Sequence, residues 1–276
     1  KGCYNDLVSL PQAPTTPPIR ADRPSAHEVK ARDLLQQAQV AVDTESNSLF
    51  AYQEQVCLVQ FSTPRHDYLL DSLALRDLCC LAPLFANPDI EKVFHAAEYD
   101  LICLRRDFGF NFANLFDTMI AARILGREAV GLGSMLEAEF GLHLDKRYQR
   151  ANWGERPLKP ALLAYARLDS HYLVALRQRL EPALHEAGRW GMAQEDFIRL
   201  CTVTVPPENH TPNCWRVAGG KEITPRQAAV LEALCQYRED RARQADVPPF
   251  KVLSNESLAA IAMALPPDLE ALDAVD

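Results

Sequence analysis

Apolar residues recur along the chain with two different spacings, and each spacing predicts one kind of element. Short apolar runs bounded by turn residues are typical of strands. They predict strands that begin at residue 40 and that cover 56–61, 68–70 and 92–95. The first three lie close together along the chain, which favours a meander in which each strand pairs with the next.

Apolar positions three and four residues apart are typical of amphipathic helices. In the first 200 residues this spacing predicts helices at 25–38, 73–85, 98–108, 118–125, 132–140, 161–180 and 182–200. Capping signals support several of these ends. Ser25 with Glu28 forms a capping-box pattern, and Asp117 is a candidate N-cap. Strands that alternate with helices, followed by helices alone, predict an α/β domain.

Proline-rich segments indicate where this domain begins and ends. The many prolines before residue 25 predict an extended tail over 1–24, and the segment 205–212 breaks the periodicity. Beyond it, Thr224-Pro225 can begin a helix that runs to about residue 244, a turn follows at 247–250, and 255–264 is a further helix. The predicted order is therefore a tail at 1–24, an α/β domain at 25–205, a linker at 206–220 and a small all-helical domain at 221–276.

The composition narrows the class of protein. The chain has 276 residues, 48% of them hydrophobic and 24% charged, which excludes collagen-like and wholly disordered proteins. No transmembrane span and no signal peptide are expected. Eight cysteines without zinc-site spacing predict reduced thiols in a cytoplasmic protein. The net charge of −8 argues against a broad basic surface for nucleic acid, but not against an enzyme whose carboxylates hold metal ions.

Three segments place carboxylates next to apolar positions predicted to be buried, where an unpaired charge is unfavourable. Asp43 and Glu45 are two residues apart at the end of an apolar strand, so they share one face. Asp100 falls in the first turn of a predicted helix, and Tyr165 and Asp169 lie four residues apart on another. Each segment alone also has an ordinary structural explanation: a turn at a strand end, a helix-dipole contact, or an ion pair with a neighbouring arginine.

Together the three segments indicate a metal site. Four carboxylates at close quarters repel one another strongly unless cations balance them, and two divalent metals supply four positive charges. Hard oxygen ligands suit Mg²⁺ or Mn²⁺. A metal pair of this kind can activate a water and stabilise the leaving oxygen of a phosphoryl displacement.

The set Asp43-x-Glu45, His95-x4-Asp100 and Tyr165-x3-Asp169 resembles the DEDDy 3′–5′ exonucleases, and among them the ribonuclease D type. Further matching segments are Phe116-Asp117-Thr118, Leu144-Asp145-Lys146, Gln149, Trp153 and Arg156-Pro157-Leu158. The segment 237–258 resembles the helical HRDC domain of RecQ-type helicases and ribonuclease D. The resemblance implies a ribonuclease-H-like mixed sheet flanked by helices, followed by a small all-α domain that is incomplete at its C-terminal end.

The resemblance also implies roles for these residues. Asp43, Glu45, Asp100 and Asp169 would hold two metal ions, Mg²⁺ or Mn²⁺, and Tyr165 would position the attacking water. Candidate substrate contacts are His95, Asp117, Lys146, Gln149, Trp153 and Arg156. Five of these have competing interpretations: His95 as a structural residue at a strand end, Asp117 as a helix N-cap, Trp153 as a packing anchor, and Lys146 and Arg156 as part of a solvated basic surface.

The expected reaction is hydrolysis of nucleotides from RNA 3′ ends with release of 5′-monophosphates, in the processing of tRNA precursors or other small RNAs. The expected partner is RNA with a free 3′ end, and the expected state is a monomer with no membrane contact. Two alternatives stay open. One is a 3′–5′ exonuclease that acts on single-stranded DNA, and the other is a catalytically silent scaffold that binds nucleic acid.

Overall fold

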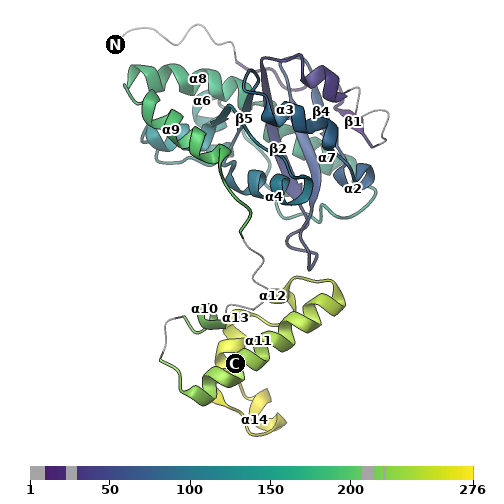
Figure 1. The fold of residues 1–276 in the computed structure, drawn as a ribbon, viewed down its shortest axis with the longest axis vertical. Coiled ribbons are helices and arrows are strands. Elements are labelled where there is room, and N and C mark those ends of the chain that lie inside the picture. Colours follow the sequence, from purple (N-terminus) through teal and green to yellow (C-terminus); the bar gives the residue numbers. More distant parts are fainter. Residues whose placement is uncertain (1–9, 23–29, 207–213, 220–221, 276) are drawn as a thin grey trace. The chain divides into compact units, whose positions relative to one another are not determined.

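The computed structural model describes residues 10–22, 30–206, 214–219 and 222–275. Its contacts divide the chain into two compact units (Figure 1). The first unit contains residues 1–46 and 55–205, and the second contains 47–54 and 206–276. The capping box predicted at Ser25 and Glu28 and most of the predicted linker fall outside the described residues.

The first unit is built on one mixed sheet of six strands, in the order β1-β4-β3-β2-β5-β6. The strands are β1 (Ile19–Ala21), β2 (Gln39–Ser46), β3 (Val56–Ser62), β4 (Asp67–Leu70), β5 (Glu91–Phe94) and β6 (Leu115–Asp117). β2, β3 and β4 pair antiparallel, which confirms the predicted meander. β5 and β6 continue the sheet in parallel from β2, and β1 pairs in parallel with β4. The mixed sheet with flanking helices confirms the predicted fold class.

Two strands were not predicted. β1 and β6 have three residues each, which is too short for the alternation of polar and apolar positions to be visible. β1 falls inside the segment predicted as an extended tail. Its backbone is indeed extended, but it is paired with β4 as an edge strand of the sheet.

Helices surround this sheet. They are α2 (Ser72–Leu75), the 3-10 helix η1 (Cys79–Leu81), α3 (Ala82–Ala86), α4 (Glu98–Phe108), α5 (Thr118–Ile124), α6 (Leu132–Phe140), α7 (Pro160–His171), α8 (Leu173–Glu186) and α9 (Trp190–Cys201). The limits predicted for α4 and α6 are confirmed. Each ends at a glycine in the left-handed region, Gly109 at φ +69° and Gly141 at φ +68°, where a side chain would be strained.

Three predicted helices were wrong in extent. The single helix predicted at 73–85 is broken into α2, η1 and α3, because Arg76 takes a positive φ of 58° after the first turn. The helix predicted at 161–180 is interrupted at Tyr172, which separates α7 from α8. Pro182 does not begin a helix but lies inside α8, and Gly188 at φ +66° precedes α9.

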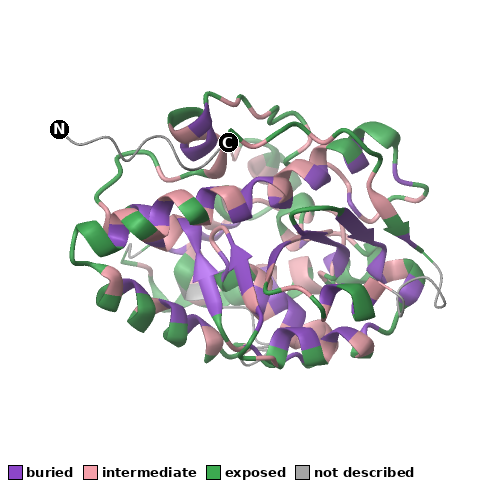
Figure 2. Cartoon of the chain, turned by 90° about the horizontal axis from the view of Figure 1, so that it is seen from above, coloured by how far each residue is buried: buried purple, intermediate pink, exposed green. Residues whose placement is uncertain are grey.

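Both faces of the sheet are buried, and the strands lie almost wholly in the interior (Figure 2). On one face, Val40 and Val42 of β2 belong to the same core as Leu101 and Leu104 of α4. On the other face, Ala41 packs in a core with α5, α6 and α8. Residues of β3 and β4 on that second face pack against Leu162, Leu163 and Ala166 of α7. Consecutive residues of β2 therefore face different layers.

The second unit is helical, as predicted. Its helices are α10 (Cys214–Val217), α11 (Pro225–Ala245), α12 (Pro249–Val252), α13 (Asn255–Ala264) and α14 (Leu269–Asp273). Thr224 caps α11 in a complete capping box with Gln227. Leu231 and Cys235 of α11 pack against Leu258 and Ala262 of α13. The turn predicted at 247–250 runs into the single helical turn of α12.

No helix in the described part of the chain is long and apolar enough to cross a membrane. The six cysteines whose side chains are described form no disulfide with one another: Cys57, Cys79, Cys80, Cys103, Cys201 and Cys235.

Candidate active site

The last residues of β2 place two carboxylates on one face of the sheet. Because side chains alternate along a strand, Asp43 and Glu45 share the face of Ala41, while Val42 and Thr44 share the other. Asp43 and Glu45 are half-buried. Both lie near the end of β2, where the pairing with β3 has a bulge between Glu45 and Ser46.

Helix α7 brings a third carboxylate to the same face. Its residues Leu162, Leu163 and Ala166 are buried against β3 and β4, which fixes the direction of the adjacent helix surface. Asp169 lies on that surface. Carboxylate oxygens of Asp43, Glu45 and Asp169 lie within 4.8 Å of one another.

The fourth carboxylate arrives from the opposite layer. Asp100 is in the first turn of α4, and α4 packs on the face of Val42 rather than that of Asp43. The Thr44 hydroxyl, which points to that face, donates a short hydrogen bond to Asp100. Asp100 is outside the group of three, yet its charge acts on Asp43. All four acids predicted from the sequence are thus gathered at one end of β2.

Burial raises the pKa of every acid in this cluster, and repulsion from the other acids raises the pKa values of Asp43 and Glu45 further. Burial is the larger cause for Asp43, followed by the charges of Asp100, Asp169 and Glu45. The pKa of Glu45 is raised in the same way. Burial raises the pKa values of Asp100 and Asp169 to about 7, although the Thr44 hydrogen bond partly opposes the shift of Asp100. Such a cluster is unfavourable when ionised without cations.

The donor set fits hard divalent cations. It consists of carboxylate oxygens, which suit Mg²⁺ and Mn²⁺ and not the softer metals that prefer cysteine or histidine. Four ionised carboxylates would balance two divalent ions. A purely structural ion pair does not account for the cluster, since no lysine or arginine is paired with Asp43, Glu45 or Asp169 among the ion pairs of the described residues.

Tyr165 lies one turn before Asp169 on α7 and is half-buried. Burial raises the pKa of its phenol, and the charges of Asp169, Glu45 and Asp43 raise it further. The phenol therefore stays protonated at neutral pH and can donate a hydrogen bond, but it cannot serve as a base. The rings of Tyr148 and Trp153 lie 5.9 and 6.2 Å from the Tyr165 ring, centroid to centroid, and hold it in place.

Two cavities open beside Tyr165 and Asp169. One, of about 270 Å³, is mainly apolar and includes Leu144, Tyr148 and Leu168 in its lining. The other, of about 150 Å³, is lined in part by Ser134, Lys146 and Gln149. The structure thus brings Lys146 and Gln149, two candidate substrate contacts, to the acid cluster.

The other four candidates are engaged with protein groups. Asp117 is almost fully buried, and its carboxylate accepts backbone hydrogen bonds from Ala96, Ala97, Met119 and Ile120. Its N-cap interpretation is therefore confirmed.

His95 hydrogen-bonds the Thr118 hydroxyl at 2.8 Å, and burial lowers its pKa. Trp153 is 2% exposed and packs with the α7 core. Arg156 forms a two-pronged ion pair with Asp71, each bond 2.8 Å long, and also donates to the Trp153 carbonyl oxygen. Arg156 thereby holds the segment that carries Trp153, whose ring packs beside that of Tyr165.

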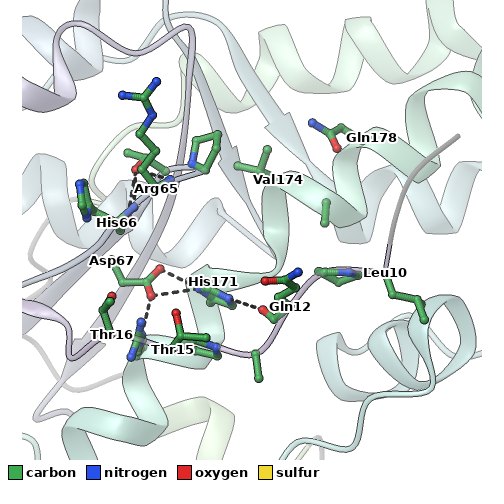
Figure 3. Close-up of a pocket in the computed structure, with 17 residues that line it drawn as sticks. Leu10, Gln12, Thr15, Thr16, Arg65, His66, Asp67, His171, Val174 and Gln178 are labelled. Atoms are coloured by element: carbon green, nitrogen blue, oxygen red, sulfur yellow. Dashed lines mark hydrogen bonds and ion pairs between the residues drawn. The ribbon is translucent and has the colours of Figure 1, made fainter.

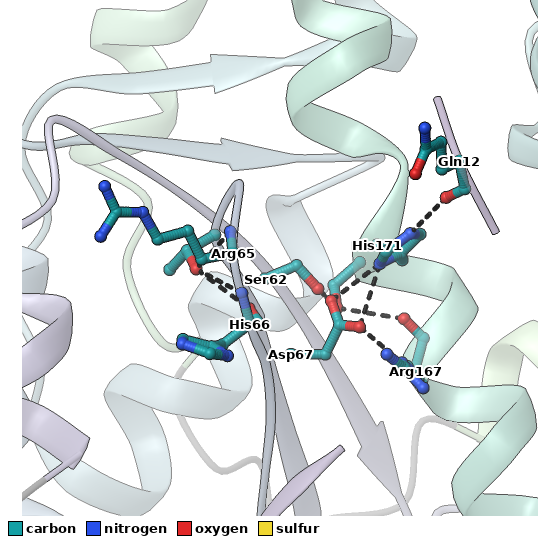
Figure 4. A network of polar contacts seen from close by, with 9 residues as sticks. Gln12, Ser62, Arg65, His66, Asp67, Arg167 and His171 are labelled. Carbon is teal, nitrogen blue, oxygen red and sulfur yellow. Dashed lines mark hydrogen bonds and ion pairs between the residues drawn. The ribbon is translucent and has the colours of Figure 1, made fainter. Parts of the chain in front are cut away.

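Sequence reasoning missed the group that anchors α7. Asp67 at the start of β4 accepts hydrogen bonds from Arg167 and His171, and Ser62 of β3 hydrogen-bonds Ser170 at 2.8 Å (Figure 4). Arg167 and His171 lie on either side of Asp169 in the sequence, so these bonds fix the rotation of the helix that carries Asp169. Burial alone would raise the pKa of Asp67, but hydrogen bonds from His171, Ser62 and Arg167 outweigh it, and the pKa is lowered.

A larger cavity, of about 510 Å³, lies over this anchor (Figure 3). Residues 10–16 cross it, and the Gln12 carbonyl accepts a hydrogen bond from His171. Its lining includes Arg65, His66 and Asp67, but none of the clustered acids. The chemistry of the acid cluster, and not cavity size, identifies the candidate active site.

Comparisons with known proteins agree with this assignment. A family model described as 3′-5′ exonuclease matches residues 21–185, and an HRDC domain model matches 227–276. The exosome complex exonuclease RRP6 of Saccharomyces cerevisiae is 34% identical over 268 residues, covering 91% of this chain and 37% of that protein. Ribonuclease D of Gluconacetobacter diazotrophicus is 34% identical over 236 residues, covering 84% of this chain and 60% of that protein.

The fold has a close structural counterpart. The catalytic core of RRP6 from Trypanosoma brucei matches with a TM-score of 0.83 and 29% identity, covering 97% of this chain and 77% of that one. These matches confirm the resemblances drawn from the sequence motifs. The chain spans between a third and two thirds of the length of the two curated relatives named above.

Proposed function

The chain belongs to the 3′–5′ exonuclease family, and from that premise we propose that it hydrolyses RNA from the 3′ end and releases 5′-monophosphates. The observation that carries the proposal is the meeting of Asp43, Glu45 and Asp169 within 4.8 Å, with Asp100 close enough to act on Asp43. These acids come from three separate elements. Burial raises the pKa values of these carboxyl groups, so their ionised forms need bound cations to be stable. Divalent cations held in this way can take part in phosphodiester hydrolysis.

The four acids would hold two divalent ions, Mg²⁺ or Mn²⁺. When bound, such ions lower the pKa of a coordinated water and stabilise the charge on the leaving oxygen. The residues of the chain supply position and environment. The carboxylates would hold the cations at the end of β2, and the protonated Tyr165 phenol would donate a hydrogen bond that orients the attacking water.

The two cavities beside Tyr165 support an assignment of substrate contacts. Lys146 and Gln149 would contact the sugar-phosphate backbone from the smaller cavity, and Tyr148 and Leu144 would contact a base from the apolar one. We propose a positioning role for His95, Asp117, Trp153 and Arg156 instead of direct substrate contact. Each of these is already bound to protein groups or packed in the core.

The proposed substrate is RNA with a free 3′ end, such as a tRNA precursor or another small RNA, and the proposed state is a cytoplasmic monomer. The names of the relatives, ribonuclease D and an exosome exonuclease, favour RNA over DNA. A DNA exonuclease and a silent binding scaffold are the outcomes that the test must be able to reveal.

The test is digestion of a 5′-labelled single-stranded RNA and a DNA of the same sequence, with Mn²⁺ or with EDTA. We expect a ladder that shortens from the 3′ end of RNA and requires Mn²⁺. Asp43→Asn abolishes the ladder, whereas Asp196→Asn, an exposed acid on α9, leaves it unchanged.

Other outcomes reject the proposal in different ways. If the protein degrades DNA and leaves RNA intact, it is a DNA exonuclease and the proposed RNA substrate is wrong. Binding of RNA without cleavage in Mg²⁺ and in Mn²⁺ supports the scaffold. Equal cleavage by wild type and Asp43→Asn shows that the activity does not come from the acid cluster.

A further inference from the structure

A buried glutamine on β3 has no partner for its side-chain amide. Gln60 has 0% exposure, and neither its amide nitrogen nor its amide oxygen has a hydrogen-bond partner among the described residues. Buried polar groups in native proteins are nearly always hydrogen-bonded, and an exception calls for a physical explanation. An apolar residue of the same size would avoid the cost of burying this amide.

The strand register places Gln60 directly beside the proposed active site. Gln60 is the Cα partner of Asp43 in the antiparallel β2–β3 pair. Residues opposite each other in such a pair share a face, with Cβ atoms about 4.5–5.5 Å apart. Val59 and Phe61, its neighbours on β3, belong to the core on the other side of the sheet. Gln60 therefore shares with Asp43 the face that α7 covers.

The other neighbours of Gln60 on this face are apolar or already hydrogen-bonded to another residue. Leu69 is its Cα partner on β4 and belongs to the apolar core beneath α7. Ser62, two residues along β3 on the same face, is already hydrogen-bonded to Ser170. This leaves Asp43 as the polar group that the register brings closest to the Gln60 amide.

From these observations we infer that Gln60 is a positioning residue, whose amide N–H donates to the Asp43 carboxylate when that carboxylate holds a divalent cation. The inference rests on the proposed function and deepens it. A carboxylate has about four lone-pair sites, and a cation leaves some of them free to accept a hydrogen bond. Groups that bond to metal ligands in this way fix the ligand's orientation, and their loss typically weakens metal binding 10- to 100-fold.

Gln60→Met separates positioning from packing, because methionine keeps the unbranched shape and removes the amide. The first measurement is thermal unfolding in EDTA. We expect the variant to melt at the same temperature as wild type or higher, since it loses a buried amide that has no partner. The second is Mn²⁺ binding by calorimetry without RNA, where we expect a dissociation constant raised about 10- to 100-fold.

Val59→Ala is the matched control. Val59 is the adjacent residue on β3, fully buried in the core on the opposite face. This variant loses packing, so its melting temperature falls, but its Mn²⁺ dissociation constant stays at the wild-type value. If Gln60 had only a structural role, Gln60→Met would likewise lower the melting temperature and leave the Mn²⁺ dissociation constant unchanged.

A Gln60→Met variant that melts lower than wild type in EDTA, or that binds Mn²⁺ within about threefold of wild type, overturns the inference. Failure of wild type itself to bind Mn²⁺ rejects the metal site of the proposed function, and the inference with it. In unmutated protein, addition of Mg²⁺ should shift the Gln60 side-chain NH₂ resonance and leave that of the exposed Gln178 in place. An unshifted Gln60 resonance at saturating Mg²⁺ rejects the inference even if the variant does not fold.

Discussion

Asp67→Asn removes the negative charge that faces Arg167 and His171 and nearly preserves the shape of the side chain. The Asp67 and Arg167 side chains are 3% and 10% exposed, so water cannot replace the lost carboxylate. His171 can release its proton and become neutral, but Arg167 cannot. The variant therefore leaves a guanidinium buried without its counter-charge.

The expected cost follows from this burial. Removing one partner of a buried ion pair typically costs about 3–5 kcal/mol. We expect about 3 kcal/mol, because the asparagine oxygen can still accept a hydrogen bond from Arg167 and His171 can adapt. At about 2–4 °C for each kcal/mol in a domain of this size, the melting temperature should fall by roughly 6–12 °C. Mn²⁺ binding should weaken as well, since Arg167 and His171 hold the helix that carries Asp169.

The assay is urea unfolding at pH 7 in EDTA, with Asp196→Asn as the control. Asp196 forms an ion pair with Arg199 on the surface of α9, with side chains 37% and 75% exposed. Exposed pairs of this kind contribute at most about 1 kcal/mol. If the two variants lose the same free energy of unfolding, the reasoning that burial makes Asp67 an anchor is refuted.

Three further predictions concern the acid cluster and its surroundings. Tyr165→Phe should lower kcat about 10²-fold at an unchanged KM, because a misplaced water slows the reaction and does not weaken RNA binding. Tyr148→Phe is the control: it keeps the neighbouring ring and should leave kcat unchanged. An equal loss of kcat in both variants would contradict the role of the Tyr165 phenol. The pKa values of Asp100 and Asp169 are raised to about 7 from 3.8, so the folded state holds extra protons and the metal-free protein should lose stability as the pH rises from about 4 to about 7. Melting curves should show this loss in EDTA and not in millimolar Mn²⁺; a metal-free protein that gains stability over the same range would reject the assigned shifts. Asp117→Ala should lower the free energy of unfolding by roughly 2 kcal/mol or more, because it leaves four backbone N–H groups without an acceptor. Calorimetry should nevertheless find a Mn²⁺ affinity close to that of wild type. A loss of Mn²⁺ binding in this variant would show that Asp117 is a metal ligand.

Local chemistry let the sequence determine several elements with their limits. Helices α4 and α6 were predicted with the bounds that the structure has, because their apolar positions repeat at helical spacing and each ends at a glycine. The N-caps at Asp117 and Thr224 are equally local, since each side chain accepts a hydrogen bond from a backbone N–H two or three residues ahead in the helix that it begins. Asp43 with Glu45 and Tyr165 with Asp169 were found for the same reason, because spacings of two and four residues place side chains on one face of a strand or helix. Asp100 was found by its place in the first turn of a predicted helix.

The sequence could not show how these pieces meet. Tyr172 interrupts a continuous helical pattern, and the pattern itself carries no sign of the interruption. Asp67 bonds residues 100 and 104 positions further along the chain, and nothing in its neighbourhood distinguishes it from a turn residue. The partner strand of β2 and its register, which set Gln60 beside Asp43, are likewise decided by pairing across the sheet.

The sequence by itself thus determined the local elements and the identity of the reactive side chains, because both depend on interactions within a few residues. Only the tertiary structure shows that the acids of β2, α4 and α7 lie together at one end of β2. Asp43 and Glu45 come from one face of the sheet, and Asp100 comes from the helix on the other. Only the packing of both layers on β2 brings these charges together, and that closeness is what creates the need for metal ions.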